Sequence, residues 1–113
     1  MVLYLSLCLT ETWLCSELRK SLVYNPLAEI FFYRDHRGVE VDFLITQGDK
    51  TIGIECKSSA LITMKDCKNL NSVKEEFKNN FLGIILYRGK EVVKMDRNIM
   101  AVPFEGLLCD GII

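Results

Sequence analysis

The stretch VEVDFLITQGDKTIGIECKSS (residues 39–59) contains the strongest fold signal in the chain. Apolar and polar side chains alternate over residues 39–45, which predicts a strand with one buried face. The turn signal QGDK and the apolar run TIGIECK (51–57) then predict a second strand paired with the first. On the first strand we expect Val39, Val41, Phe43 and Ile45 to face one way, and Glu40, Asp42 and Leu44 the other.

The remaining sequence predicts two helices and further strands around this hairpin. Helices are expected over residues 11–23 and 63–79, the second with Thr63 and Asp66 as an N-terminal capping pattern. The run FLGIILYR (81–88) predicts a strand covered on both faces. Further strands are expected at 29–34, 89–95 and 99–103, with residues 88–90 as a hairpin turn. We therefore expect an α/β (α+β) fold, a mixed sheet with an antiparallel three-strand meander flanked by helices.

Composition indicates one soluble domain and excludes several classes of protein. The chain has 113 residues and a net charge of −1, so it lacks the basic surplus typical of a dedicated DNA-binding domain. Its five cysteines are odd in number and lack CxxC spacing, which argues against a disulfide framework or zinc site and favours a reducing cytoplasm. The apolar start is too short to span a bilayer, and the lone His36 lies in a predicted turn.

Two carboxylates come together if the predicted hairpin forms. Asp42 and Glu55 are separated by 12 residues, so adjacent strands hold them as near neighbours, with Lys57 on the same face as Glu55. Two such charges about 5 Å apart repel by about 3 kcal/mol at an effective dielectric constant near 20. A raised pKa, a bound cation or solvent must offset that repulsion, and Mg²⁺ is the cation expected where the ligands are oxygen atoms. The alternative is a half-exposed sheet face on which Glu and Lys are solvated, paired charges.

The same residues resemble a known family. YRDHRGVEVDFLI (33–45), followed by IECKSS (54–59), resembles the C-terminal domain of a large prokaryotic group of AAA+-type ATPases. ILYRGKEVVK (85–94) and IMAVPFEGLL (99–108) resemble the end of that domain. The fold of that domain is similar to the PD-(D/E)XK nuclease superfamily, which includes restriction endonucleases and Holliday junction resolvases. The resemblance implies one restriction-endonuclease-like domain over residues 1–113, either as a fragment of a longer ATPase chain or as a degenerate stand-alone remnant.

The resemblance also implies a set of site residues. Asp42 and Glu55 match the metal-binding acids of the superfamily, and Lys57 matches its catalytic lysine. TETWLCSELRK (10–20) places Glu11 at the position of the first metal-binding acid, with Glu17 as the alternative. Glu40 is expected to support the site or to pair with a base on a neighbouring strand. The segment before Glu11 departs from the family pattern, and the chain contains no Walker A sequence.

Two functional classes follow from these residues. The first is a Mg²⁺-dependent (or Mn²⁺-dependent) nuclease that cleaves DNA, with Glu11, Asp42 and Glu55 as ligands and Lys57 positioning the attacking water. Its nucleic-acid contacts are expected at Lys65 and Lys68, with Lys74 and Lys78 as further candidates or as a solvated helix face. The second is an inactive accessory module for protein docking or nucleic-acid binding. In both, the expected partner is an N-terminal AAA+-type ATPase domain, and no membrane is involved.

Overall fold

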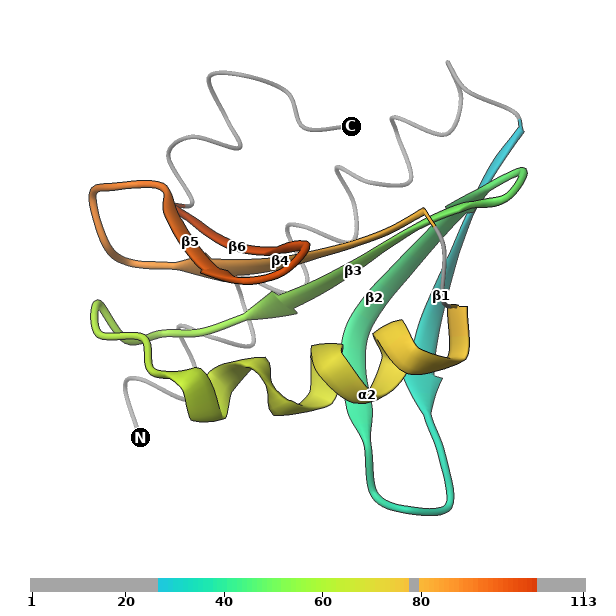
Figure 1. The fold of residues 1–113 in the computed structure, drawn as a ribbon, viewed down its shortest axis with the longest axis horizontal. Helices are drawn as coiled ribbons and strands as arrows, with labels where there is room; N and C mark the ends of the chain where they lie inside the picture. Colours follow the sequence, from blue (N-terminus) through green and yellow to red (C-terminus); the bar gives the residue numbers. More distant parts are fainter. Residues whose placement is uncertain (1–26, 78–79, 104–113) are drawn as a thin grey trace.

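The computed structural model describes residues 27–77 and 80–103, which form a six-stranded mixed sheet with a helix against one face (Figure 1). The sheet order is β1-β2-β3-β4-β6-β5. The predicted mixed α+β architecture is thus confirmed, whereas the helix expected at 11–23 lies outside the described residues. The elements are β1 (Ala28–Arg34), β2 (Glu40–Gln47), β3 (Lys50–Cys56), the 3-10 turn η1 (Met64–Cys67), α2 (Lys68–Phe77), β4 (Phe81–Tyr87), β5 (Val93–Asp96) and β6 (Ile99–Pro103).

The first three strands form the predicted antiparallel meander. A two-residue loop, residues 48–49, joins β2 to β3 and lies between the paired residues Gln47 and Lys50. The first loop residue, Gly48, has a φ of +63°, a backbone conformation that glycine adopts without steric cost. The β1–β2 turn contains the exposed His36, as the sequence predicted.

The crossover through η1 and α2 makes β4 parallel to β3, and β4 is also parallel to β6. β4 buries side chains on both faces of the sheet, Ile84 and Leu86 in one apolar cluster and Ile85 and Tyr87 in the other, which explains its continuous apolar run. Gly53 of β3 pairs with Gly83 of β4 beneath the fully buried Leu70 of α2. A Cβ atom on Gly53 would lie 3.0 Å from Leu70 Cδ2 and 2.9 Å from Phe81 Cζ. The two glycines therefore let α2 approach the sheet closely.

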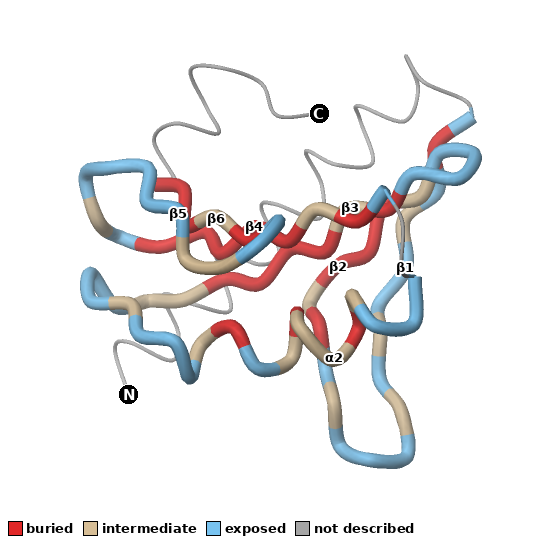
Figure 2. Tube along the Cα trace, viewed as in Figure 1, coloured by how far each residue is buried: buried red, intermediate tan, exposed pale blue. Residues whose placement is uncertain are grey.

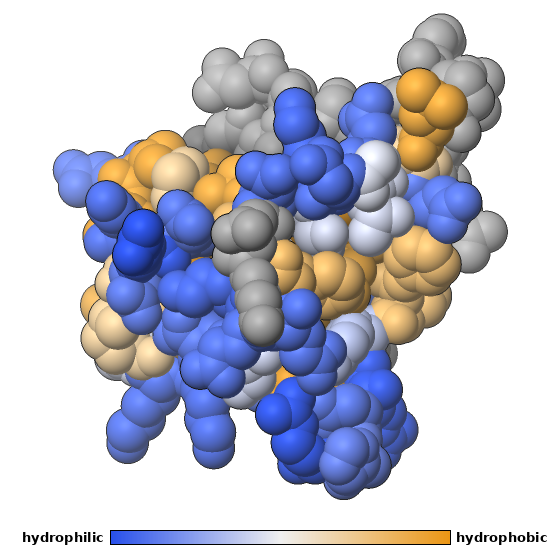
Figure 3. All heavy atoms as spheres, turned by 45° about the vertical axis from the view of Figure 1, so that its right-hand side comes forward, coloured by the Kyte–Doolittle hydropathy of each residue, from blue (hydrophilic) through white to orange (hydrophobic). Residues whose placement is uncertain are grey.

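Two apolar clusters lie on the two faces of the sheet, and the central strands are the most buried (Figure 2). The cluster beneath α2 includes Leu70, Val73 and Ile85, whereas the other includes Phe43 and Ile54. Edge strand β1 is more exposed than the strands inside the sheet. Hydrophobic side chains are visible on both the left and the right of the face in Figure 3. The large hydrophobic residues exposed in and just before β1 are Leu27, Phe31 and Phe32.

The predicted hairpin turn at residues 88–90 is wrong. β5 pairs antiparallel with β6 at the far edge of the sheet, so the hairpin joins β5 to β6. Its turn contains Asn98, whose φ of +62° is tolerated better by asparagine than by most residues. Burial explains the arrangement, because β6 carries the buried Ile99, Ala101 and Val102, whereas β5 has no buried residue and fits the edge.

The predicted alternation along β2 is also wrong. Asp42 and Phe43 of β2 together lie opposite the single residue Phe32 of β1, which is the arrangement of a β-bulge. The extra residue changes the side-chain alternation, so Val41 and Leu44 both pack in the cluster beneath α2. Phe43 packs in the cluster on the opposite face instead.

Candidate active site

The bulge places Asp42 where the β2–β3 pairing ends. The last residues paired between these strands are Phe43 and Ile54. Beyond them the Cys56 N–H donates to Asp42 Oδ2 at 2.8 Å. The Lys57 N–H donates to the Leu86 carbonyl of β4 at 2.7 Å. The end of β3 is therefore fixed by a carboxylate on one side and by a strand on the other.

Glu55 lies on the next position of β3 and is buried. The β2–β3 register, continued by one pair, brings it opposite Asp42, as the hairpin predicted. Burial, and then the negative charge of Asp42, raise the pKa of Glu55 to about 7. The charge of Lys57 and a hydrogen bond from Asn69 act in the opposite direction. Glu55 is thus poised to exchange a proton near neutral pH.

Asp42 has a raised pKa for the same main reason, because it too is partly buried. The hydrogen bond from Cys56 and the charge of Lys57 oppose this rise, and the charge of Glu40 adds to it. Glu40 itself forms an exposed ion pair with Arg34 of β1, 3.1 Å between Oε1 and Nε. The expectation that Glu40 pairs with a base on a neighbouring strand is therefore confirmed.

Lys57 follows directly after β3 and makes an ion pair with η1. Its Nζ lies 3.6 Å from Asp66 Oδ1. The other oxygen of Asp66, Oδ2, accepts a hydrogen bond from the Thr63 N–H at 2.8 Å, as the predicted capping pattern requires. The sequence identified Asp66 as a capping residue and did not connect it, or Asn69, with the site. Their link to it depends on where the crossover places η1 above the sheet.

The carboxylates of Asp42 and Glu55 are oxygen donors that suit Mg²⁺, which one or two carboxylates plus water commonly hold in proteins. Within residues 27–77 and 80–103 no group of three His, Cys, Asp or Glu residues is arranged to hold a metal ion. The predicted third acid, Glu11, and its alternative, Glu17, both lie outside the described residues.

The lysines of the crossover differ in their surroundings. Lys65 and Lys68 are exposed at the start of η1 and α2, in the same short segment as Asp66. Lys74 donates instead to the Arg97 carbonyl in the β5–β6 turn, at 2.9 Å. Lys78 lies outside the described part of the chain.

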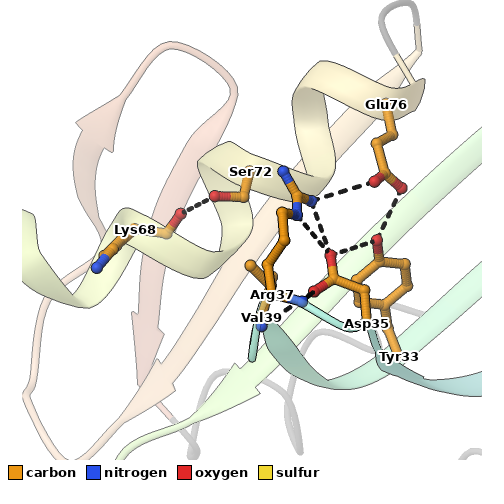
Figure 4. Close-up of polar contacts among 7 residues, drawn as sticks. All are labelled: Tyr33, Asp35, Arg37, Val39, Lys68, Ser72 and Glu76. Atoms are coloured by element: carbon orange, nitrogen blue, oxygen red, sulfur yellow. Dashed lines mark hydrogen bonds and ion pairs between the residues drawn. The ribbon is translucent and has the colours of Figure 1, made fainter.

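A second polar cluster, which sequence reasoning missed, joins the β1–β2 turn to the end of α2 (Figure 4). Tyr33 donates to Glu76 at 2.7 Å and to Asp35 at 3.2 Å, and Arg37 bridges the same two carboxylates. The hydrogen bond to Glu76, followed by desolvation, raises the pKa of Tyr33 to about 12. The paired Arg37 lowers the pKa of Asp35 to about 2. These contacts attach the β1–β2 turn to α2.

The described residues thus define a mixed α+β domain in which the buried Glu55, the half-buried Asp42 and Lys57 meet where the β2–β3 pairing ends. A family model, the domain of unknown function DUF4143, matches residues 8–107, and the chain belongs to that family. No curated protein and no solved structure matches the chain. None of the helical segments that the structure describes has the length and apolar character needed to cross a membrane.

Proposed function

We propose that this chain is a Mg²⁺-dependent nuclease-like domain of the PD-(D/E)XK type that hydrolyses phosphodiester bonds in DNA. The observation that carries the proposal is the pairing of β2 with β3, which puts Asp42 beside Glu55 with Lys57 at the same end of β3. Both carboxyl pKa values are raised, which is common where acidic groups gather at functional sites. As part of the same proposal, the sheet and α2 form a restriction-endonuclease-like core.

In this function Asp42 and Glu55 hold the metal, with Glu11 as the third ligand that the resemblance implies. The bound cation would supply positive charge to a phosphate oxygen and lower the pKa of a coordinated water. Lys57 donates hydrogen bonds to the attacking water and stabilises the negative charge that develops on the phosphate. The Cys56 N–H keeps Asp42 directed at the site, because this hydrogen bond fixes one carboxylate oxygen.

We further propose that Lys65 and Lys68 contact the DNA backbone, because both are exposed next to Asp66. The proposed partner is an N-terminal AAA+-type ATPase domain, and the proposed location is the prokaryotic cytoplasm. The partner and the prokaryotic source come from the resemblance of the sequence motifs, and the cytoplasmic location comes from the odd number and the spacing of the cysteines.

A metal titration tests the metal site. We would add Mg²⁺ and Mn²⁺ to the wild type and to Asp42→Asn/Glu55→Gln, and follow binding by calorimetry and backbone NMR shifts. The control is Glu29→Gln/Glu75→Gln, which removes two exposed carboxylates away from the site. We expect saturable binding in the wild type and control, lost in the site variant, with shifts centred on residues 42 and 55. Absence of binding at millimolar metal would contradict the metal-dependent function.

The second candidate function is an inactive accessory module for protein docking or nucleic-acid binding. It is favoured by the near-neutral net charge of −1, which differs from the basic surplus typical of a dedicated DNA-binding domain. Cleavage assays on branched and single-stranded DNA distinguish the candidates. The accessory module would be favoured if the protein binds DNA in the absence of metal, does not cleave it, and does not bind metal.

A further inference from the structure

We propose that Asp66 is a positioning residue that fixes the amine of Lys57 and ties it to the start of η1. The inference rests on the proposed function, because it assigns a role in the same site. Each oxygen of Asp66 has its own partner: Oδ1 lies 3.6 Å from Lys57 Nζ, and Oδ2 accepts from the Thr63 N–H at 2.8 Å. One side chain thus holds the lysine and the first turn of the crossover together.

Backbone hydrogen bonds also restrain the loop between Lys57 and Asp66. The ion pair between these two residues joins the two ends of that loop. The Lys57 N–H is bonded to β4, and the Ser59 carbonyl accepts from the Arg88 N–H at 3.1 Å. Ser59 Oγ also accepts from the Leu61 N–H at 3.0 Å. With the backbone anchored at both ends, the ion pair limits the directions that the Lys57 side chain can take.

The partial burial of this ion pair supports a positioning role. The Asp66 side chain is 24% exposed and that of Lys57 is 39% exposed, unlike the Arg34–Glu40 pair, whose side chains are 80% and 59% exposed. Solvent therefore screens the attraction between Lys57 and Asp66 less than the attraction within the more exposed Arg34–Glu40 pair.

Asn69, three residues after Asp66, contacts Glu55 as Asp66 contacts Lys57. Residues three apart on a helix lie on one face, and Asn69 hydrogen bonds the Glu55 carboxylate. Leu70 next to it packs on Gly53 and Gly83, which fixes the height of α2 above the sheet. The η1–α2 junction therefore sets the relative position of Lys57 and Glu55.

Substitution of Asp66 by asparagine separates its two roles. The amide introduced by Asp66→Asn would keep an oxygen that accepts the Thr63 N–H, whereas the negative charge that pairs with Lys57 is lost. Asp66→Ala removes both contacts and serves as the second variant. The matched control is Asp96→Asn, because Asp96 also accepts a backbone N–H, that of Arg97, and a side-chain hydrogen bond, that of Asn71.

The first measurement is ¹³C relaxation of the Lys57 side chain in the full chain. The second is the Mn²⁺-dependent hydrolysis of bis(p-nitrophenyl) phosphate, with thermal unfolding as a check on the fold. We expect a more mobile Lys57 in Asp66→Asn, with kcat about tenfold lower and KM little changed, the size typical of a lost supporting contact. Asp96→Asn is expected to match the wild type in both measurements.

Lys57 motion that is equal in Asp66→Asn and the wild type would overturn the inference. Increased motion with an unchanged kcat would overturn the positioning role in catalysis. A wild type that fails to hydrolyse the probe contradicts the proposed function, and the relaxation data alone then decide whether Asp66 fixes Lys57. Unfolding of Asp66→Ala together with a folded Asp66→Asn would support the separation of the two roles.

Discussion

Replacement of Glu55 by Gln should stabilise the domain at alkaline pH in the absence of metal. The pKa of Glu55 rises from 4.5 to about 7 on folding, mainly because the carboxylate is buried. A carboxyl group with a raised folded-state pKa contributes its full stability below the unfolded pKa, and that contribution is lost as pH rises through the folded pKa. The rise corresponds to about 3 kcal/mol once both states are ionised, at 1.36 kcal/mol for each pKa unit.

The assay is urea unfolding, followed by circular dichroism from about pH 4 to about pH 8.5. We expect the free energy of unfolding of Glu55→Gln to equal that of the wild type near the acid end. The difference should grow between about pH 4.5 and pH 7 and approach about 3 kcal/mol above it, in favour of the variant. Glu29→Gln, at an exposed position of β1, corrects for the general effect of one lost charge.

A wild type that stays as stable as Glu55→Gln at alkaline pH would refute the claim that folding desolvates this carboxylate. Mg²⁺ adds a second comparison, because a cation that binds the ionised pair stabilises the folded state by mass action. If the metal site is present, Mg²⁺ should reduce the difference at alkaline pH by stabilising the wild type, and it should have little effect on Glu55→Gln.

Three further predictions concern the packing around α2. Gly53→Ala should lower stability by about 1–3 kcal/mol in thermal unfolding, because the new Cβ would meet Phe81 and Leu70 at 2.9 and 3.0 Å; a neutral result would show that α2 moves easily. Leu70→Ala should cost about 2–5 kcal/mol in urea unfolding, since Leu70 is fully buried, and a loss under about 1 kcal/mol would argue against this core. Tyr33→Phe removes the hydrogen bond to Glu76 and should cost about 1 kcal/mol; in the wild type, one tyrosine should ionise near pH 12 by ultraviolet titration, and its absence would contradict the contact.

The sequence predicted the meander, the helix at 63–79 and the strand at 81–88 because local signals were strong there. Turn residues at QGDK and the apolar run of β4 left few alternatives, and both were confirmed. The place of β5 could not be read in the same way, because the order of neighbouring strands depends on which strand buries more surface. Its pattern of exposed and half-buried residues made it an edge strand, and β6 took the inner place.

The sequence identified the residues of the candidate site, whereas it did not predict the backbone geometry that positions them. Asp42, Glu55 and Lys57 were identified from their spacing, yet the period-2 alternation over residues 39–45 predicted a regular strand and gave no sign of the bulge at Asp42. A strict alternation would put Val41 on the face of Phe43, whereas the structure packs Val41 with Leu44 beneath α2. Where the β2–β3 pairing ends, the Asp42 carboxylate accepts a hydrogen bond from the Cys56 N–H.

The contacts that Asn69 and Lys57 make with Glu55 explain how the fold accommodates two neighbouring carboxylates at this position. An unsupported buried carboxylate is costly, and the fold offsets part of that cost for Glu55 with Asn69 and Lys57. These supports come from the crossover and the end of β3, so the site forms only when α2 packs on Gly53 and Gly83. The close packing of α2 thus brings the groups that offset the cost of burying the acids. Such a local cost, offset elsewhere in the fold, is expected where a fold holds groups for chemistry rather than for stability alone.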